Sequence, residues 1–363
     1  MTYKSTDPNG GDLGSPDTAE AGSEGSAAKH IRFVVPVVLL AVLGVYWWLH
    51  SHRQALPEAY VGERSATLWS SLAQVRQPLG ALRYGERIGV LERRGDQVYV
   101  RTADGSRGWV EARVLMDPAL WQRRAQLLEQ ARAMPAQARG RTGRVCNVHL
   151  EPGRIAVRVY QFARGVPVEM VARAVAEWTP ASEEEQKPRR EDWFLVRGFA
   201  STEEGPAGSE RDVAKAEQWI PVAGWVLARF IEFNLPNAVR DYTSSAGTHV
   251  VAWFELNRVR DQGGEKPQYL VAGSRGGEGQ PCDFTMIRVY TWGAKRQRYE
   301  TAHVESNLCG YLPIRAGKTA AGDPEFRFAA EAKFGREEHR YFMRQTIVHR
   351  VREGEPPSAH RHR

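Results

Sequence analysis

Cysteine is scarce in this 363-residue chain, and the short motifs that mark common catalytic and metal sites are missing. The chain has three cysteines and no Cys-x-x-Cys pair, which excludes a disulfide-dense scaffold and the usual zinc-binding spacing. It has no His-Glu-x-x-His, no Gly-x-Ser-x-Gly and no Walker A sequence. From the sequence we therefore predict no catalytic residue, no metal ion and no cofactor.

The histidines and cysteines that are present do not form a recognisable site. His249, His303, His339 and His349 fall on different predicted strands, and a lone histidine is usually a surface residue or a satisfied core residue. A nucleophile made of Cys146 and a histidine would rest on composition alone. The sequence also leaves open whether the other two cysteines, Cys282 and Cys309, form a disulfide or remain two buried thiols.

Charge separates the N-terminal segment from the rest of the chain. Residues 1–30 are rich in Gly, Ser, Asp, Pro and Glu and hold no apolar run, which predicts a disordered tail. This tail is acidic, although the whole chain carries a formal net charge of +7, so the remainder is basic. A basic surface suits a lipid surface, an acidic cell-wall polymer or nucleic acid. The arginines form no dense block, and we expect no nucleic-acid partner.

One long apolar run follows the tail. Residues 33–49 carry no charge, and Tyr46, Trp47 and Trp48 lie at one end, where an aromatic belt is found in membrane spans. The run ends in a poor cleavage site, so we predict an uncleaved signal anchor with one transmembrane helix at 31–50; a buried core helix is the alternative. The positive charges on the two sides nearly balance. We place the N-terminus in the cytoplasm and the bulk of a bacterial single-pass protein in the periplasm.

An internal repeat defines the next part of the chain. The sequence RGWVEARVL at 107–115 returns as AGWVLARFI at 223–231. Short β-like segments separated by turn residues precede each copy, as in small antiparallel barrels. We predict one barrel at 58–116 and a second, with polar insertions, at 141–234.

The two copies resemble the bacterial SH3-like (SH3b) domains. The residues that fit the family pattern are Gly85, Val90, Val100, Asp104, Gly105, Gly108, Trp109 and Val110 in the first copy, and Gly165, Val168, Trp193, Val196, Gly224, Trp225 and Val226 in the second. The first copy departs from the pattern at Gln97, where the family carries a Trp. The second copy carries an insertion at 179–192 and a longer segment before Gly224, which puts the family's ligand surface in doubt.

The resemblance implies that ligands lie across exposed aromatic side chains of the barrels, where flat rings offer contact area at low entropic cost. The candidate ligand-binding residues are Trp69, Tyr84 and Tyr99 in the first copy and Tyr160, Trp193 and Trp219 in the second. We assign a structural role to Gly108, Trp109, Gly224 and Trp225, because the glycines permit a tight bend and the tryptophans close one end of a small barrel.

Residues 117–140 connect the two predicted barrels. Asp117 is a good N-cap, Pro118 suits the first helical position, and apolar residues recur on one stripe, so we predict an amphipathic helix at 118–134. It either bridges the barrels or lies free on a membrane surface. Residues 237–352 contain seven β-like runs, which predict an antiparallel β domain, and 353–363 a second disordered tail. The predicted fold class is mainly β, with one transmembrane helix, two SH3-like barrels joined by a helix and a C-terminal β domain.

Two classes of function fit these features. The first is a membrane-anchored, extracytoplasmic binding or scaffold protein that recognises cell-wall peptide or glycan (peptidoglycan), or an envelope protein. The alternative is an envelope hydrolase with its active site in the 237–352 domain. The missing acid/base and metal-ligand spacings favour the first. The sequence names neither the ligand nor the oligomeric state.

Overall fold

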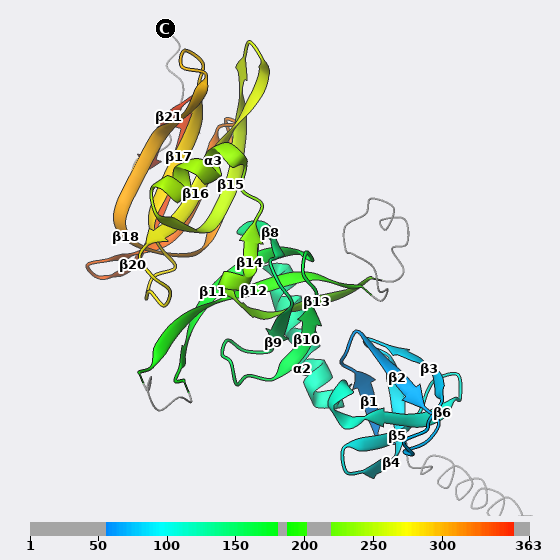
Figure 1. Cartoon of the computed structure of the whole chain (residues 1–363). Helices are drawn as coiled ribbons and strands as arrows, with labels where there is room; N and C mark the ends of the chain where they lie inside the picture. The colour runs from blue at the N-terminus through cyan, green and yellow to red at the C-terminus, as the bar shows by residue number, and fades with distance from the viewer. Residues whose placement is uncertain (1–55, 181–186, 202–218, 352–363) are drawn as a thin grey trace, which may run out of the picture. The chain divides into compact units, whose positions relative to one another are not determined.

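The computed structural model describes residues 56–180, 187–201 and 219–351. Within these residues the protein is mainly β, with three antiparallel sheets of seven strands each and two α-helices. In Figure 1 the first sheet runs from blue to cyan, the second is green, and the third runs from yellow-green to red. The chain completes one sheet before it begins the next, and all three belong to a compact unit that begins at Pro57.

The first sheet has the strand order β3-β2-β6-β5-β4-β1-β7. Its strands are β1 (Glu58–Val61), β2 (Ser65–Trp69), β3 (Pro78–Arg83), β4 (Arg87–Arg94), β5 (Gln97–Arg101), β6 (Arg107–Glu111) and β7 (Leu115–Met116). A short 3-10 helix, η1 (Ala112–Val114), joins β6 to β7. Alternate residues of β2, β5 and β6 point into a core that holds Leu68, Val98, Val100 and Val110.

The second sheet repeats this topology strand for strand, in the order β10-β9-β13-β12-β11-β8-β14. Its strands are β8 (Ala138–Thr142), β9 (Cys146–His149), β10 (Arg158–Phe162), β11 (Pro167–Trp178), β12 (Arg189–Ser201), β13 (Trp219–Leu227) and β14 (Ile231–Phe233). The 3-10 helix η3 (Ala228–Phe230) occupies the place of η1. The repeated sequence therefore forms the same strand and 3-10 turn in both copies.

The repeated glycine has a packing reason. A Cβ atom at Gly108 would lie 2.7 Å from the carbonyl oxygen of Trp69 on β2, and one at Gly224 would lie 2.7 Å from the carbonyl oxygen of His149 on β9. In each copy the glycine lets β6 or β13 cross the neighbouring strand at close range. The tryptophan that follows pairs with that strand in both copies: Trp109 with Trp69, and Trp225 with His149.

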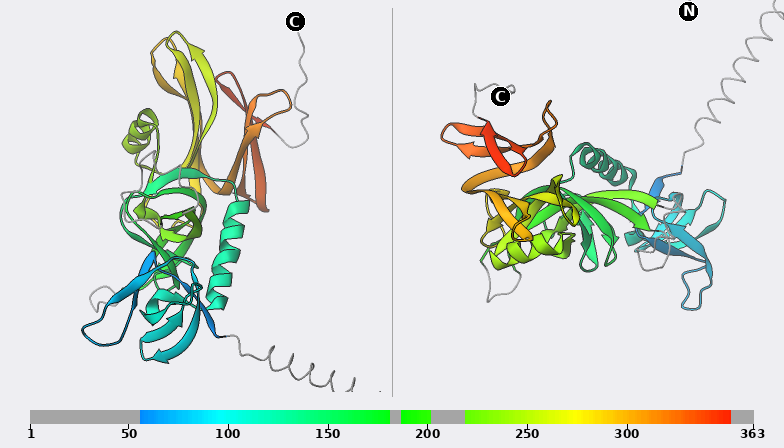
Figure 2. Two further views of the ribbon diagram at one scale, coloured as in Figure 1. Left: turned by 90° about the vertical axis from the view of Figure 1, so that its right-hand side faces the viewer. Right: turned by 90° about the horizontal axis from the view of Figure 1, so that it is seen from above.

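Helix α2 (Pro118–Ala133) follows the first sheet and packs on the outer face of the second, as Figure 2 shows. The side chain of Asp117 accepts a hydrogen bond from the Leu120 amide at 2.7 Å, which confirms the predicted N-cap. The contact with the sheet includes Leu128 and Ala131, and it covers Leu195. The apolar stripe predicted from the sequence thus finds its partner in the second sheet.

The first turns of α2 also touch the first sheet. Trp121 stacks on Tyr60 of β1, with ring centroids 4.8 Å apart, and meets Tyr84 edge to face. Arg124 is buried on the same side: its guanidinium lies 4.4 Å from the Trp121 ring and donates to the carbonyl oxygen of Pro221. A planar guanidinium can stack and donate at once, which a lysine ammonium cannot do.

The third sheet runs in sequence order from β15 to β21. Its strands are β15 (Thr248–Asp261), β16 (Gly264–Arg275), β17 (Phe284–Gly293), β18 (Arg298–Lys318), β19 (Pro324–Ala332), β20 (Gly335–Arg344) and β21 (Ile347–Val351). The first part of β18 pairs with β17 and its last part with β19. Residues of β15–β17 and of β18–β20 share one core cluster, so the sheet folds over on itself at β18.

Two expectations about the C-terminal part change in detail. Of the seven β-like runs expected at 237–352, two lie in the single strand β18, and another is divided between β20 and β21. Helix α3 (Asn237–Ser245) was not expected, because nine mostly polar residues give little helical signal. Tertiary contacts stabilise it: Val239 is buried, and the Tyr242 hydroxyl donates to the carbonyl oxygen of Tyr299 at 2.9 Å.

The predicted fold class needs correction in its membrane element. In the part of the chain that the structure describes, no helix is long and apolar enough to span a bilayer. The two α-helices have 16 and 9 residues, and a span needs about 20 apolar ones. The predicted fold class is therefore corrected, because the described residues do not contain the transmembrane helix that it included. The segment 31–50 and the predicted tails 1–30 and 353–363 lie outside the described residues.

We predict that Gly108→Ala and Gly224→Ala each lower the free energy of unfolding by about 2 kcal/mol, because the added methyl group overlaps a strand carbonyl that has no room to move. Urea unfolding followed by tryptophan fluorescence measures the change. Gly80→Ala in β3 is the matched control, since no heavy atom lies within 4 Å of the new Cβ; its effect should stay within about 0.5 kcal/mol. Equal losses at all three sites would contradict the close-crossing argument.

Candidate functional site

The six aromatic residues expected to bind ligand lie in different environments. Tyr84, Tyr160 and Trp193 are buried, with 1%, 4% and 1% of their surface exposed, so they lack the open ring face that the prediction required. Trp69 and Tyr99 are half-buried. Trp219 begins β13, and its side chain lies outside the described part of the structure.

The burial of Tyr84 and Tyr160 follows from packing between the two copies. Their rings meet edge to face at 4.7 Å, and the Tyr84 hydroxyl donates to the carbonyl oxygen of Val159 at 3.5 Å. Burial raises the pKa of Tyr84, and it raises the pKa of Tyr160 to about 12. Nothing in a single copy's sequence signals this contact, because each ring's partner belongs to the other copy.

A row of aromatic rings crosses the outer face of the first sheet. Trp109 pairs in register with Trp69 on one side and with Tyr99 on the other. Two guanidinium groups lie on these rings: that of Arg76 is 4.2 Å from the Trp69 centroid, and that of Arg94 is 5.4 Å from the Trp109 centroid. Trp109 is only 8% exposed, but its side chain does not belong to the core cluster of the first sheet. It therefore packs on the outer face and does not close the end of the barrel as predicted.

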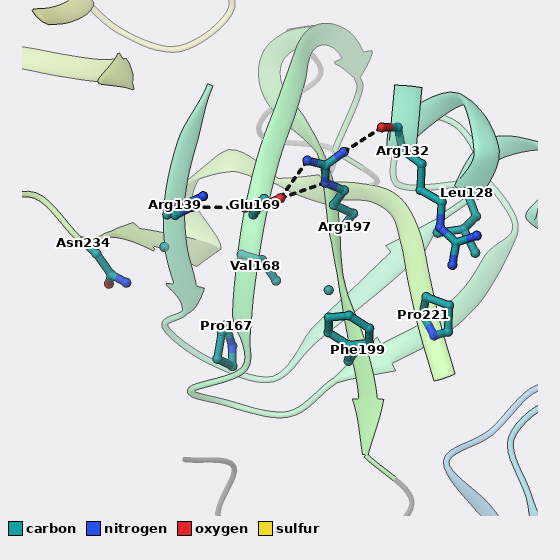
Figure 3. Close-up of a pocket in the computed structure, with 12 residues that line it drawn as sticks. Leu128, Arg132, Arg139, Pro167, Val168, Glu169, Arg197, Phe199, Pro221 and Asn234 are labelled. Carbon is teal, nitrogen blue, oxygen red and sulfur yellow. Dashed lines mark hydrogen bonds and ion pairs between the residues drawn. The ribbon is translucent and has the colours of Figure 1, made fainter. Parts of the chain in front are cut away.

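The second sheet carries a groove of about 490 Å³ beside α2 (Figure 3). Its walls come from α2, β8, β11, β12 and β13, which places residues from five separate elements around one space. Apolar groups supply most of the lining, namely Leu128, Pro167, Val168, Phe199 and Pro221. Arginines stand at the rim, namely Arg132, Arg139 and Arg197.

Arg197 organises the rim of the groove. Its Nε donates to the Glu169 carboxylate at 2.9 Å. Its Nη1 donates to the carbonyl oxygens of Ala131 at 2.8 Å and Arg132 at 3.1 Å, at the end of α2. Figure 3 shows it reaching toward Glu169 on one side and toward α2 on the other. A cation at this position satisfies helix carbonyls that have no partner within the helix. Arg139 donates to the same carboxylate at 3.1 Å.

The charges around Glu169 leave the rim positive. Burial raises the pKa of this carboxyl, but the hydrogen bonds and charges of Arg197 and Arg139 together bring it below its ordinary value. One carboxylate therefore faces two guanidinium groups, with Arg132 nearby and paired to Glu129 at 2.6 Å. An apolar groove with such a rim suits a ligand that combines apolar groups with a carboxylate.

A second arginine network was also missed by the sequence. Arg173 on β11 is buried and donates to Asp192 at 2.7 Å and to the carbonyl oxygens of Gln280 at 2.9 Å and Cys282 at 3.0 Å. Cys282 and Cys309, whose pairing the sequence left open, are joined by a disulfide beside this network. The residues meet only in the tertiary structure, so spacing along the chain gives no signal for them.

Titratable side chains gather at one place in the third sheet. The Tyr341 hydroxyl donates to Glu305, His339 lies 3.4 Å from the same carboxylate, and the rings of His303 and Tyr341 are 5.6 Å apart. Burial lowers the pKa of His303, which Glu305 opposes. Of the four histidines expected to be scattered, two therefore meet here, because β18 and β20 bring their residues to one core.

The described residues offer little support for a cysteine nucleophile or a metal-binding site. Cys146 is buried, and burial raises the pKa of its thiol to about 12, so it is a poor nucleophile at neutral pH. Among the residues that the structure describes, the one group with metal-ligand proximity is Cys282, Cys309 and Glu331. Its two sulfur atoms are bonded to each other, which leaves no thiolate to ligate a metal.

Comparisons with known proteins give no family for the chain. No family model matches it, and no curated protein matches. Similar solved structures include an NlpC/P60 family protein from Bacillus cereus ATCC 10987, with 10% identity, a TM-score of 0.22, and coverage of 67% of this chain and 93% of that chain. NlpC2 from Trichomonas vaginalis has 8% identity, a TM-score of 0.16, and coverage of 82% and 97%.

Similarity at this level defines neither the fold of the whole chain nor an activity. These matches do not bear on the SH3b resemblance. That resemblance stays a prediction based on the repeated residues.

We predict a pH-dependent effect for Glu169→Gln. The folded-state pKa of Glu169 is lowered, so its carboxylate contributes stability above the ordinary carboxyl pKa and loses it as pH falls through the lowered folded value. The variant should be less stable than the parent by about 1 kcal/mol at pH 7, and the difference should shrink toward zero at an acid pH below the lowered folded-state pKa. Urea unfolding at both pH values measures it. A difference that grows on acidification would contradict the ion-pair assignment.

Proposed function

We propose that this protein is an extracytoplasmic binding protein that holds a cell-wall peptide in the groove between α2 and the second sheet. The observation that carries the proposal is the groove's lining, in which an apolar floor is edged by Arg132, Arg139 and Arg197. The stem peptides of cell walls combine small apolar side chains with free carboxylates, which matches this lining. The basic character of the chain outside its N-terminal tail favours the same anionic partner.

The disulfide supports the proposed compartment. Disulfides persist in oxidising environments such as the periplasm and are rare in the cytosol. Cys282 and Cys309 are bonded to each other, whereas the third cysteine, Cys146, is a buried free thiol. A bonded pair beside a network that fixes Arg173 is consistent with a structural bond in an extracytoplasmic protein.

Arg139→Ala tests the groove. The side chain is 74% exposed and pairs only with Glu169 among the described residues, so its removal should leave the fold intact. We expect it to weaken sedimentation of the protein with purified peptidoglycan about five- to thirtyfold, the loss of about 1–2 kcal/mol typical of an interface anchor. Peptidoglycan from which an amidase has removed the stem peptides should bind weakly.

Arg141→Ala is the matched control for this experiment. Arg141 lies on the same strand, is 62% exposed and pairs with Glu232 as Arg139 pairs with Glu169, but it does not line the groove. Its variant should bind as the parent does. Equal losses for Arg139 and Arg141 would show a general charge effect, and full binding to glycan without peptide would reject the peptide assignment.

A second candidate function is an enzyme with its active site in the third sheet. The observation that favours it is the gathering of His303, Glu305, His339 and Tyr341, because paired imidazole and carboxylate groups can exchange protons with a substrate. If this holds, the protein releases soluble fragments from peptidoglycan, and Glu305→Gln lowers the rate at least about a hundredfold. Glu300→Gln, on the same strand and paired with Arg296, is the control. No release by the parent protein would reject this candidate.

A further inference from the structure

The two copies differ on their outer face, which α2 covers in the second copy. The registers make the positions equivalent: Trp109 corresponds to Trp225, and the residues that pair with them, Tyr99 and Leu195, correspond to each other. In the second sheet this face lies under α2, with Leu128 and Ala131 of the helix against it. In the first sheet no described helix packs on the equivalent face, and two arginine side chains lie on its rings.

An arginine at equivalent positions of the two sheets binds the end of a helix in the second sheet but has no such partner in the first. Arg197 of the second sheet corresponds to Arg101 of the first, because both lie two residues beyond the equivalent positions Leu195 and Tyr99. Arg197 donates to the last carbonyl oxygens of α2, those of Ala131, Arg132 and Met134. Arg101 is exposed and has no charged or hydrogen-bonding side-chain partner among the described residues.

The positive charge at this end of the open face favours a negatively charged binding partner there. Arg101 is paired in register with Arg107, which is also exposed and also has no acidic partner in the described part of the chain. Like charges directly opposite each other on neighbouring strands are unfavourable, so this pair favours a negative group brought from outside. The C-terminal end of a helix supplies partial negative charge and free carbonyl oxygens.

We propose that the outer face of the first sheet is a docking surface for an amphipathic α-helix of a partner protein, seated as α2 is seated on the second sheet. Its apolar stripe covers Trp69, Trp109 and Tyr99 and displaces the arginines that lie on the rings. Leu79 on the edge strand β3 is 53% exposed and extends the apolar surface beside Trp69. The last turn of the helix ends at Arg101 and Arg107. This surface is separate from the groove of the second sheet and does not depend on the ligand proposed there.

The probe for this surface is a synthetic peptide with the sequence of residues 117–134, which forms α2 and its cap, labelled with a fluorophore at its N-terminus. In the intact protein α2 already occupies the second sheet, so the added peptide has only the first sheet's face to bind. We expect saturable binding by fluorescence anisotropy, with hydrogen-exchange protection on β2, β5 and β6. A peptide with Leu127→Glu and Leu128→Glu should not bind.

Variants of the full chain locate the contact. Tyr99→Ala and Arg101→Ala should each raise the Kd of the peptide at least about fivefold, the size of an anchor contact. Arg93→Ala is the matched control, since Arg93 is an exposed arginine of the same sheet outside the row, and it should change the Kd less than about twofold. Because Arg101 is exposed, its variant keeps the fold even if Tyr99→Ala does not.

Three results would overturn the proposal. The first is no saturable binding at peptide concentrations up to about 1 mM, the limit of weak specific association. The second is binding that Arg101→Ala leaves unchanged. The third is protection on β12 and β13 instead of the first sheet, which would mean that the peptide only exchanges with α2.

Discussion

The packing of α2 on the outer face of the second sheet is the contact on which the rest of the arrangement depends. Leu128 and Ala131 bury the sheet's apolar surface, and Arg197 closes the contact by binding the helix's last carbonyl groups. The same helix reaches back to the first sheet through Trp121 and Tyr60. The groove exists because α2 covers only part of this face, so helix and groove share one wall.

Arginine side chains make the main polar contacts between these elements. Arg124, Arg173 and Arg197 each donate to backbone carbonyl oxygens that belong to other elements. Because the guanidinium is planar and always charged, it can bind several carbonyls at once or stack on a ring while it donates. The three residues therefore join parts of the chain that are distant in sequence and are not paired as neighbouring strands.

The two copies show how one topology acquires different surfaces. Both keep the strand order, the glycine that allows the close crossing and the 3-10 turn after it. Their outer faces differ because a helix covers one and arginine side chains lie on the other. Equivalent positions such as Arg101 and Arg197 thus have unlike surroundings.

The sequence by itself determined the features that depend on neighbouring residues. The start of α2 follows from Asp117 and Pro118, and the repeat of Gly-Trp-Val identifies two related β units because a Cβ at either glycine would meet a strand carbonyl. Only the tertiary structure decided which rings are buried. Tyr84 and Tyr160 cover each other across the copies, and neither local sequence contains its partner. The groove likewise draws on five elements, and Arg197 is distant in sequence from the helix end it binds, so no spacing could reveal either one.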